Sequence, residues 1–271
     1  MREATSTLLR VAAACLVAGC LACGRSPAAS LEVEPRVVRL DPGRSVPLRV
    51  EFRPESAIDV PPERVYVFAH LLDERGAVVR TFDHPLPAGW KKGEILAYDL
   101  DLYESVQADP LAAGSYALTM GLYDIERGYR WPLRVEGEKG KTREYRVATV
   151  EAAPPGADNP RFQFAGDWSP PEPYADKQTI VLRWMLGAAE IRVREIPSPG
   201  TVRLRLRVEG EPGVTLRSTC EPGSVRPLPK GSHWISIEAA GDCEIQVDPA
   251  APSEHAVAAL ARLEVVAWRP K

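Results

Sequence analysis

The sequence lacks the short motifs that mark most well-characterised enzyme families. It has no Gly-x-Ser-x-Gly elbow, no His-Glu-x-x-His zinc motif, no P-loop and no dinucleotide-binding fingerprint. The run Gly166–Ser169 is only a loose match to a hydrolase nucleophile motif, and no suitable histidine-containing run follows it. We therefore expect a protein that has no catalytic activity and no cofactor. An enzyme built from residues scattered along the chain stays an alternative.

Excess basic charge and long apolar runs are also lacking. The chain has 34 Lys and Arg against 37 Asp and Glu, a net charge of −3 at pH 7, and neither half is strongly basic. Nucleic acid is therefore not an expected partner. The N-terminal apolar run covers about nine residues, whereas a membrane-spanning helix needs roughly 20.

The N-terminus carries a secretion signal that ends in a lipidation site. Arg2 and Arg10 form a positive region, residues 11–19 form a short apolar segment, and the tetrapeptide Val-Ala-Gly-Cys ending at Cys20 is a lipobox. It predicts a signal peptide over residues 1–19, cleavage before Cys20, a diacylglycerol on the Cys20 thiol and acylation of the new N-terminus. Several acyl chains together give stable membrane anchoring.

The alternatives are a plain secretory signal, a transmembrane helix, or a second register ending at Cys23. The second register fits less well, because Cys20 would then take a position that favours a branched apolar residue. Leu21 follows Cys20, and by analogy with lipoprotein sorting in Gram-negative bacteria this favours the outer membrane. We expect a bacterial lipoprotein of the cell envelope, with residues 20–30 as a tether.

Cysteine is scarce, and the five residues have separate expected fates. Cys15 leaves with the signal, Cys20 takes the lipid and Cys23 lies in the tether. Cys220 and Cys243 remain in the folded part, in an oxidising compartment, so we expect a disulfide between them. Two buried free thiols are an alternative. A metal pair is less favoured, because no other cysteine or histidine lies close to either residue in sequence.

Long helical periodicity is nearly absent. The 26 Pro and 20 Gly residues punctuate short runs rich in Val, Leu, Ile, Tyr and Trp, a pattern typical of an all-β chain. The proline-rich stretch 152–160 predicts a linker between two domains, residues 31–151 and 161–271. In the second domain, residues 253–262 are rich in Ala and could form a short helix.

The first domain has the strand pattern of a β-sandwich. Residues 65–72 and 77–82 are expected to form a hairpin around the turn Asp73–Gly76. Residues 94–102 alternate, so that the even-numbered, mostly aliphatic positions face a core. The start Gly114–Leu118 (Gly-Ser-Tyr-Ala-Leu) is similar to the tyrosine corner of immunoglobulin-like sandwiches.

One set of residues in each domain carries a resemblance to known modules. The set in the first domain is Val67–Asp73, Gly76, Asp83–Pro85, Trp90, Gly93, Glu94, Gly114–Tyr116 and Gly121–Asp124, and the set in the second is Trp168, Glu172, Arg183, Trp184 and Ala188–Val193. By its set, the first domain resembles small β-sandwich modules appended to bacterial membrane glycosyltransferases and other envelope proteins, and this implies an immunoglobulin-like fold and an envelope setting without carrying over catalysis. The second resembles a jelly-roll module of the galactose-binding type, which implies a binding fold.

Arginines alternate with aliphatic residues in two runs of the second domain. The runs 189–196 and 202–208 are separated by a Pro-Ser-Pro-Gly turn, so we expect them to pair as a hairpin. A hairpin would place five guanidiniums on one face, suited to an anionic ligand because Arg binds carboxylate and phosphate in a two-pronged geometry. The alternative is a solvated face neutralised by nearby glutamates. The five are Arg192, Arg194, Arg203, Arg205 and Arg207.

A proline-stiffened loop offers aromatic rings. Trp168 and Tyr174 flank three prolines and Glu172, a combination that could stack on a sugar ring and bind its hydroxyls. The alternative is that both rings fold back over the end of the sandwich. Three other tryptophans, Trp184, Trp234 and Trp268, lie in strand-like runs and are expected in the core.

The histidines are scattered, and two could meet in the first domain. His70 and His84 flank the expected hairpin with Asp73 and Asp83 nearby, which could make a small metal site. We favour hydrogen-bonded residues at the end of the sandwich and expect no metal.

The sequence therefore predicts a non-catalytic, lipid-anchored envelope protein whose second domain binds a glycan or an acidic envelope ligand, such as a polysaccharide or lipopolysaccharide. We expect the N-terminal lipid to attach the protein to the membrane. One alternative is a structural or assembly lipoprotein that binds another envelope protein. A second is an envelope glycan hydrolase or esterase.

Overall fold

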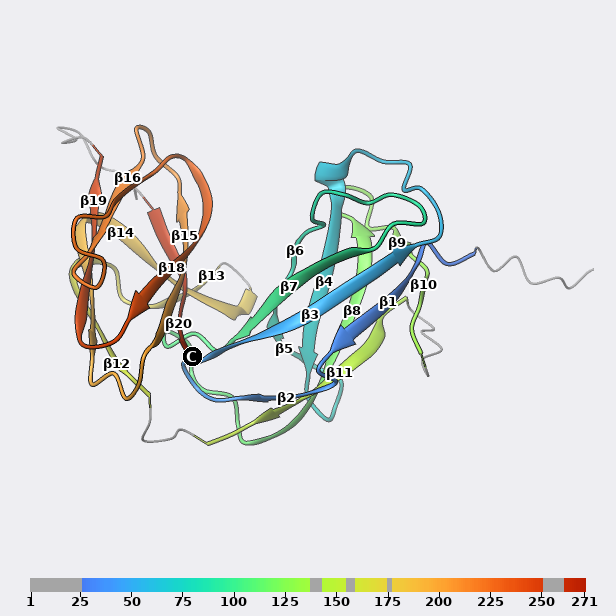
Figure 1. The fold of residues 1–271 in the computed structure, drawn as a ribbon, viewed down its shortest axis with the longest axis horizontal. Coiled ribbons are helices and arrows are strands. Elements are labelled where there is room, and N and C mark those ends of the chain that lie inside the picture. Colours follow the sequence, from blue (N-terminus) through green and yellow to red (C-terminus); the bar gives the residue numbers. More distant parts are fainter. Residues whose placement is uncertain (1–25, 137–142, 155–158, 175–176, 251–260) are drawn as a thin grey trace, which may run out of the picture.

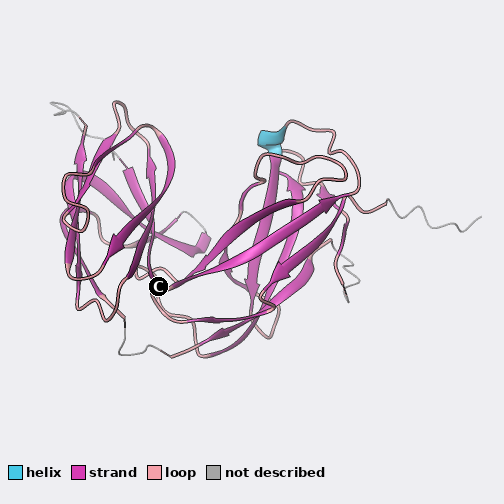
Figure 2. Cartoon of the chain, in the orientation of Figure 1, coloured by secondary structure: helices cyan, strands magenta, loops and turns pink. Residues whose placement is uncertain are grey.

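The chain is built almost entirely of β-strands. The structure, a computed structural model, describes residues 26–136, 143–154, 159–174, 177–250 and 261–271. The only helix in these segments is a single 3-10 turn, η1 (Pro62–Arg64), and none of them holds a helix that could cross a membrane. Figures 1 and 2 show strands packed into two bodies, so the prediction of an all-β sandwich protein is confirmed. The lipobox and Cys20 lie outside the described residues.

The first half, residues 26–152, is a sandwich of two sheets with a hydrophobic core between them. Large side chains from both sheets, among them Phe52, Leu71, Leu102 and Met120, are fully buried there. One sheet has the order β10-β1-β3-β7, and the other β2-β11-β8-β4-β5, with β6 on β4 and β9 on β8. The strands are β1 (Ala29–Glu34), β2 (Val37–Leu40), β3 (Ser45–Pro54), β4 (Val65–Leu72), β5 (Val78–Thr81), β6 (His84–Pro85), β7 (Leu96–Tyr103), β8 (Gly114–Asp124), β9 (Arg130–Trp131), β10 (Leu133–Arg134) and β11 (Tyr145–Ala152).

Local predictions for the first half are confirmed. β4 and β5 form the expected hairpin, because the Asp73 carboxylate accepts hydrogen bonds from the backbone N–H groups of Arg75 and Ala77, at 2.9 and 2.8 Å, and fixes the turn. On β7 the even-numbered leucines are buried, as the alternation predicted. The Tyr116 hydroxyl donates to the Ala112 carbonyl at 2.8 Å, which is the hydrogen bond of a tyrosine corner.

The second half, residues 161–271, is one nine-stranded sheet folded into two layers through the long strand β14. The beginning of β14 pairs with β13 and β20, and its end, from Ala189 to Val193, pairs with β12 and β19. The core lies between the layers. The strands are β12 (Arg161–Trp168), β13 (Glu172–Tyr174), β14 (Lys177–Arg194), β15 (Gly200–Val208), β16 (Val214–Ser218), β17 (Val225–Leu228), β18 (Gly231–Ala239), β19 (Cys243–Pro249) and β20 (Ala261–Pro270).

Three predictions for the second half have different outcomes. The disulfide is confirmed: Cys220 and Cys243 are bonded, with their Cα atoms 5.3 Å apart. The run 189–196, expected as a strand of its own, is instead the end of a longer one, because the chain stays extended through Gly187 and forms the single strand β14. The expected helix at 253–262 lies outside the described residues except for its last two, which begin β20.

The two halves are joined along β20, which is buried on both faces. Leu263, Val266 and Trp268 belong to the core of the second half, whereas Val265 and Ala267 are buried outside that core. Side chains alternate along a strand, and a β-bulge at Glu264 shifts this alternation between Leu263 and Val265. We therefore place Val265 and Ala267 against the first half.

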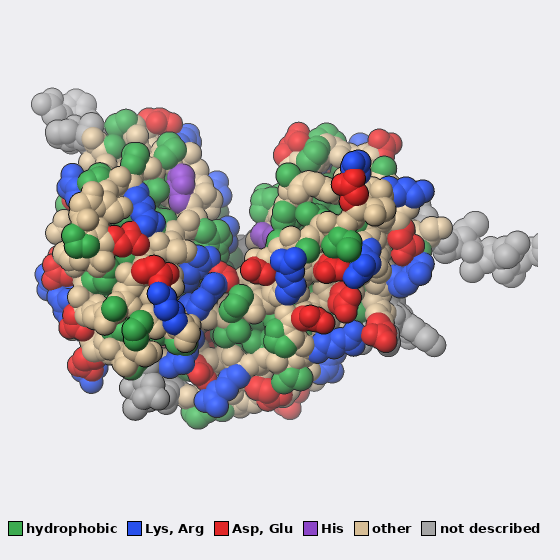
Figure 3. Space-filling model, in the orientation of Figure 1, with side chains coloured by type: hydrophobic (Ala, Val, Ile, Leu, Met, Phe, Trp, Pro, Cys, Tyr) green, Lys and Arg blue, Asp and Glu red, His purple; other side chains and the backbone are tan. Residues whose placement is uncertain are grey.

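Backbone hydrogen bonds cross this junction. The Trp268 N–H donates to the Gly43 carbonyl at 2.7 Å, and the Val106 N–H donates to the Val266 carbonyl at 2.9 Å. The Gln107 side chain adds a hydrogen bond to the Leu263 carbonyl at 3.1 Å. The halves meet at this base and diverge above it, so that a notch separates them in Figure 3.

Candidate functional site

The outer face of β15 is turned toward the first half, because Arg203 on it contacts Asp101 on β7. Its aliphatic residues, such as Leu204 and Leu206, are buried in the core, so alternation sends its arginines to the opposite face. Trp234 on β18 lies directly across from Arg205. The residues gathered here from both halves, which we call the border site, are Asp101, Tyr103, Arg203, Arg205, Trp234 and Arg269.

Trp234 is an exposed ring supported by positive charge. The residue is 44% exposed. The guanidinium carbons of Arg203 and Arg205 lie 5.4 and 5.8 Å from its ring centroid, within the range of a cation–π contact. The Tyr103 ring of the first half meets it edge-on, with the centroids 5.7 Å apart. The indole is therefore held in place and still reaches solvent.

Positive charge exceeds negative charge at the border site. The Asp101 carboxylate is nearly buried and takes ion pairs from two guanidiniums, those of Arg203, at 2.5 Å, and Arg269. Arg205 pairs with Glu264 at 2.9 Å. Three arginines therefore share two carboxylates. This excess attracts an anion, because screening is weak for partly buried charges.

Two half-buried side chains, His84 beside the border site and Tyr103 within it, have pKa values shifted in the direction that favours the neutral form. Burial is the main cause that lowers the pKa of His84, and the charge of Arg205 lowers it further. The ring contacts the Phe82 carbonyl through Nδ1, at 2.9 Å, and the Tyr98 hydroxyl through Nε2, at 2.8 Å. A carbonyl can only accept, so Nδ1 carries the proton and Nε2 accepts from Tyr98. Burial likewise raises the pKa of Tyr103.

A second aromatic group lies on the same outer face of the second half. Arg262 on β20 stands opposite both Arg207 on β15 and Trp184 on β14. Its guanidinium carbon lies 4.5 Å from the ring centroid of Tyr174 and 5.9 Å from that of Trp184. Glu264 pairs with Arg262 at 2.8 Å. The arginine contacts both rings, and it shares the Glu264 carboxylate with Arg205.

The structure separates the five predicted arginines into two groups. The expected hairpin is wrong, because β20 lies between β14 and β15. Arg192 and Arg194 therefore lie in the other layer of the second half, where they pair with Glu190 and Glu244, both at 2.6 Å. Only the three arginines of β15 face the first half, and each is also held by a carboxylate.

The residues of the predicted aromatic loop also separate into two groups. Trp168 folds back on the core, and its indole N–H donates to the Glu190 carbonyl at 3.1 Å, as the alternative interpretation described. Tyr174 contacts Arg262, and the Glu172 carboxylate accepts a hydrogen bond from the Trp184 indole. The roles of these residues in binding stay predictions.

The prediction of a buried position is wrong for two of the three strand tryptophans. Trp268 is buried as expected, but Trp234 and Trp184 are both partly exposed. For Trp234 the sequence held a signal, since this ring is out of phase with Ile235 and Ile237, which are buried. Trp184 is likewise out of phase with Met185, a residue of the core.

The two histidines of the first half do not share a site. His70 contacts Asp83 at 3.3 Å and Glu144 at 3.8 Å, while His84 turns toward Tyr98. No cluster of three or more potential metal ligands occurs in the described parts of the chain.

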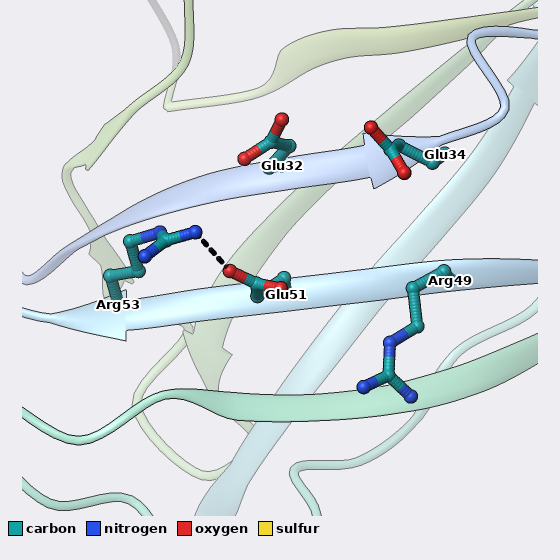
Figure 4. A pocket seen from close by; sticks show the side chains of 5 residues that line it. All are labelled: Glu32, Glu34, Arg49, Glu51 and Arg53. Carbon is teal, nitrogen blue, oxygen red and sulfur yellow. Dashed lines mark ion pairs between the residues drawn. The ribbon is translucent and has the colours of Figure 1, made fainter.

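A small surface pocket of about 190 Å³ lies on the outer face of β1 and β3. Figure 4 shows its five charged side chains, with Glu32 and Glu34 on β1 and Arg49, Glu51 and Arg53 on β3. Glu51 pairs with Arg53, and Arg49 pairs with Asp99 at 3.7 Å. Alternating charges of this kind are typical of a solvated sheet face, and the pocket offers no aromatic platform.

Comparisons with known proteins give only distant likenesses. No protein-family model matches the chain, and no curated protein matches it. Among solved structures, the secreted serine protease VesC from Vibrio cholerae is similar at 9% identity and a TM-score of 0.31, over 89% of this chain and 51% of that one.

Two further structures are similar at the same level. The M60 catalytic domain with two CBM51 domains of Clostridium perfringens ZmpB has 9% identity and a TM-score of 0.29, over 90% of this chain and 31% of that one. Alpha-2-macroglobulin of E. coli has 13% identity and a TM-score of 0.27, over 83% and 12%. The chain thus spans about half of the first structure and under a third of the others, and likenesses this weak carry no argument about its activity.

Proposed function

We propose that this protein is a lipid-anchored, non-catalytic component of a bacterial envelope that binds an acidic glycan at the border site. One observation carries the proposal: Trp234, 44% exposed, stands on the guanidiniums of Arg203 and Arg205 where arginines outnumber carboxylates.

The chemistry of the site suits a sugar that carries carboxylate or phosphate groups. An indole supplies a large, rigid apolar surface for the hydrophobic face of a sugar ring, at little cost in conformational entropy. A guanidinium has five N–H donors in a fixed fork, so Arg203 and Arg205 can keep their carboxylate partners and still donate to a ligand.

Titration calorimetry on the full lipoprotein in detergent tests the proposal. We expect saturable binding to acidic bacterial polysaccharide or to lipopolysaccharide, weaker at physiological than at low salt, and no binding to neutral polysaccharide. Trp234→Ala should lower the affinity about tenfold, the value of one good aromatic contact. Leu186→Ala, which also removes an exposed apolar side chain, is the control. If every acidic polymer fails to bind, the proposal is wrong.

Lipidation at Cys20 is tested in a separate experiment. Metabolic labelling with radioactive palmitate should mark the wild-type chain and the Cys23→Ser variant, whereas Cys20→Ser should abolish the label. Label that survives Cys20→Ser would contradict lipidation at Cys20.

A second candidate function is the binding of an envelope protein through the edge of a sheet. Among the strands that the structure describes, β2 is an edge strand paired with β11 alone, and Val37 on it is 64% exposed. Such edges can accept a strand from a partner. In-cell crosslinking from position 37 would trap that partner, and a chain that crosslinks to nothing would count against this function.

A further inference from the structure

The row of arginines on β15 continues beyond the border site. Arg203, Arg205 and Arg207 share the outer face, so their backbones are about 6.7 Å apart along the strand. The side chains become more exposed in the same direction, from 18% for Arg203 and 28% for Arg205 to 50% for Arg207. The row therefore leaves the junction of the halves and enters solvent.

The row ends beside a second aromatic ring. Arg207 lies across from Arg262, and Arg262 lies across from Trp184. Three strand spacings separate Trp234 on β18 from Trp184 on β14, about 14 Å across the sheet. Two partly exposed indoles thus stand at the two ends of a strip that contains Arg205 and Arg207. We call Trp234, Arg205, Arg207 and Trp184 the contact strip.

The residues between the two indoles leave N–H donors available to a ligand that lies across the contact strip. Arg262 lies against the rings of Trp184 and Tyr174. Its side chain is only 9% exposed and is paired with Glu264 and Glu209. Arg207 contacts Glu209 through Nε, at 3.2 Å, and a guanidinium bound through Nε retains further N–H donors. Positive charge that can reach a ligand therefore continues between the two rings.

We infer that the ligand is a linear acidic polysaccharide that lies along the contact strip, rather than a single acidic sugar or a chain end. A single sugar ring covers one indole, whereas the distance between Trp234 and Trp184 requires several linked sugars. This inference rests on the proposed function, since it extends the ligand from the border site toward Trp184.

A chain-length series tests the inference. The probes are oligomers of galacturonic acid, which carry one carboxylate per sugar, from the monomer to the decamer, titrated against the full lipoprotein in detergent. We expect the decamer to bind the wild type about a hundredfold more tightly than the dimer, because its nine dimer-length registers give about ninefold by statistics and the second aromatic contact gives about tenfold more. Trp184→Ala and Arg207→Ser should each reduce that ratio toward the ninefold statistical value and leave dimer binding unchanged.

The controls separate this inference from the proposed function. Arg217→Ser removes an arginine of similar exposure from β16, which is not part of the strip, and should leave the ratio intact. Affinity that depends on Trp234 but rises with chain length only by the ninefold statistical factor would overturn the linear polymer and keep the border site. Binding by no oligomer would overturn the linear polymer, whereas the proposed function is overturned if acidic polysaccharide and lipopolysaccharide also fail to bind or if Trp234→Ala leaves their binding intact. Circular dichroism melting of each variant shows whether it is folded.

Discussion

Two arginine runs in the second half have the same sequence pattern and different surroundings. Arg203 and Arg205 on β15 face the first half and contact Asp101, Tyr103 and Trp234, whereas Arg192 and Arg194 on β14 lie on the opposite layer beside glutamates of their own half. Alternation fixes which face of a strand is polar. The surroundings of that face depend on which strands lie between, and β20 separates the two runs.

The largest effect is expected where one carboxylate holds both halves together. Asp101→Asn would leave Arg203 and Arg269 without their nearly buried partner, and should lower the free energy of unfolding by about 3 kcal/mol. Asp99→Asn, on the same strand but exposed, should cost under about 0.5 kcal/mol. Urea denaturation measures both, and equal losses would show that Asp101 does not join the halves.

The two runs can be compared directly by the same substitution. Arg203→Ser removes a partly buried ion pair and a cation–π contact, and should cost about 1–2 kcal/mol of unfolding free energy. Arg192→Ser removes an exposed pair with Glu190 and should change stability by less than about 0.5 kcal/mol. Urea denaturation of both variants under the same conditions measures the two losses of unfolding free energy. If both variants behave alike, the junction with the first half adds nothing to Arg203.

The smallest effect concerns pH. Burial lowers the pKa of His84 below its ordinary value of 6.5, so the folded state favours the neutral ring. The resulting stability is complete above pH 6.5 and is lost as pH falls through the folded pKa. Melting temperature should therefore fall between pH 7 and pH 5, and His84→Gln should flatten that fall. His233→Gln, on the surface of β18, is the control, and a matching change there would contradict a specific role for His84.

Much of the fold could be predicted because strand signals are local. Alternating hydrophobic residues located most strands, and Asp73 and Gly76 located a hairpin. The order of strands in the second half could not be read, since it depends on pairing between residues far apart, such as Gly200 with Pro270.

The residues of the border site could likewise be predicted only in part. The sequence identified Arg203 and Arg205, but nothing local to them indicates Asp101, about a hundred residues earlier and in the other half. The prediction of a buried Trp234 is wrong because a strand-like run does not by itself say which face an aromatic ring lies on, whereas the phase of Trp234 against Ile235 predicts the opposite face.

The position of β20 between β14 and β15 has a consequence for folding. β20 pairs with both of these strands, and it accepts or donates hydrogen bonds at Val106 and Gly43 of the first half, which lie far away in the sequence. Pairing over such sequence distances is slow. The first half has its own core and can form early, whereas the border site is complete only after β20 has paired with β15 and brought Arg269 to Asp101. Any change that prevents β20 from pairing would therefore remove the border site and leave the first half folded.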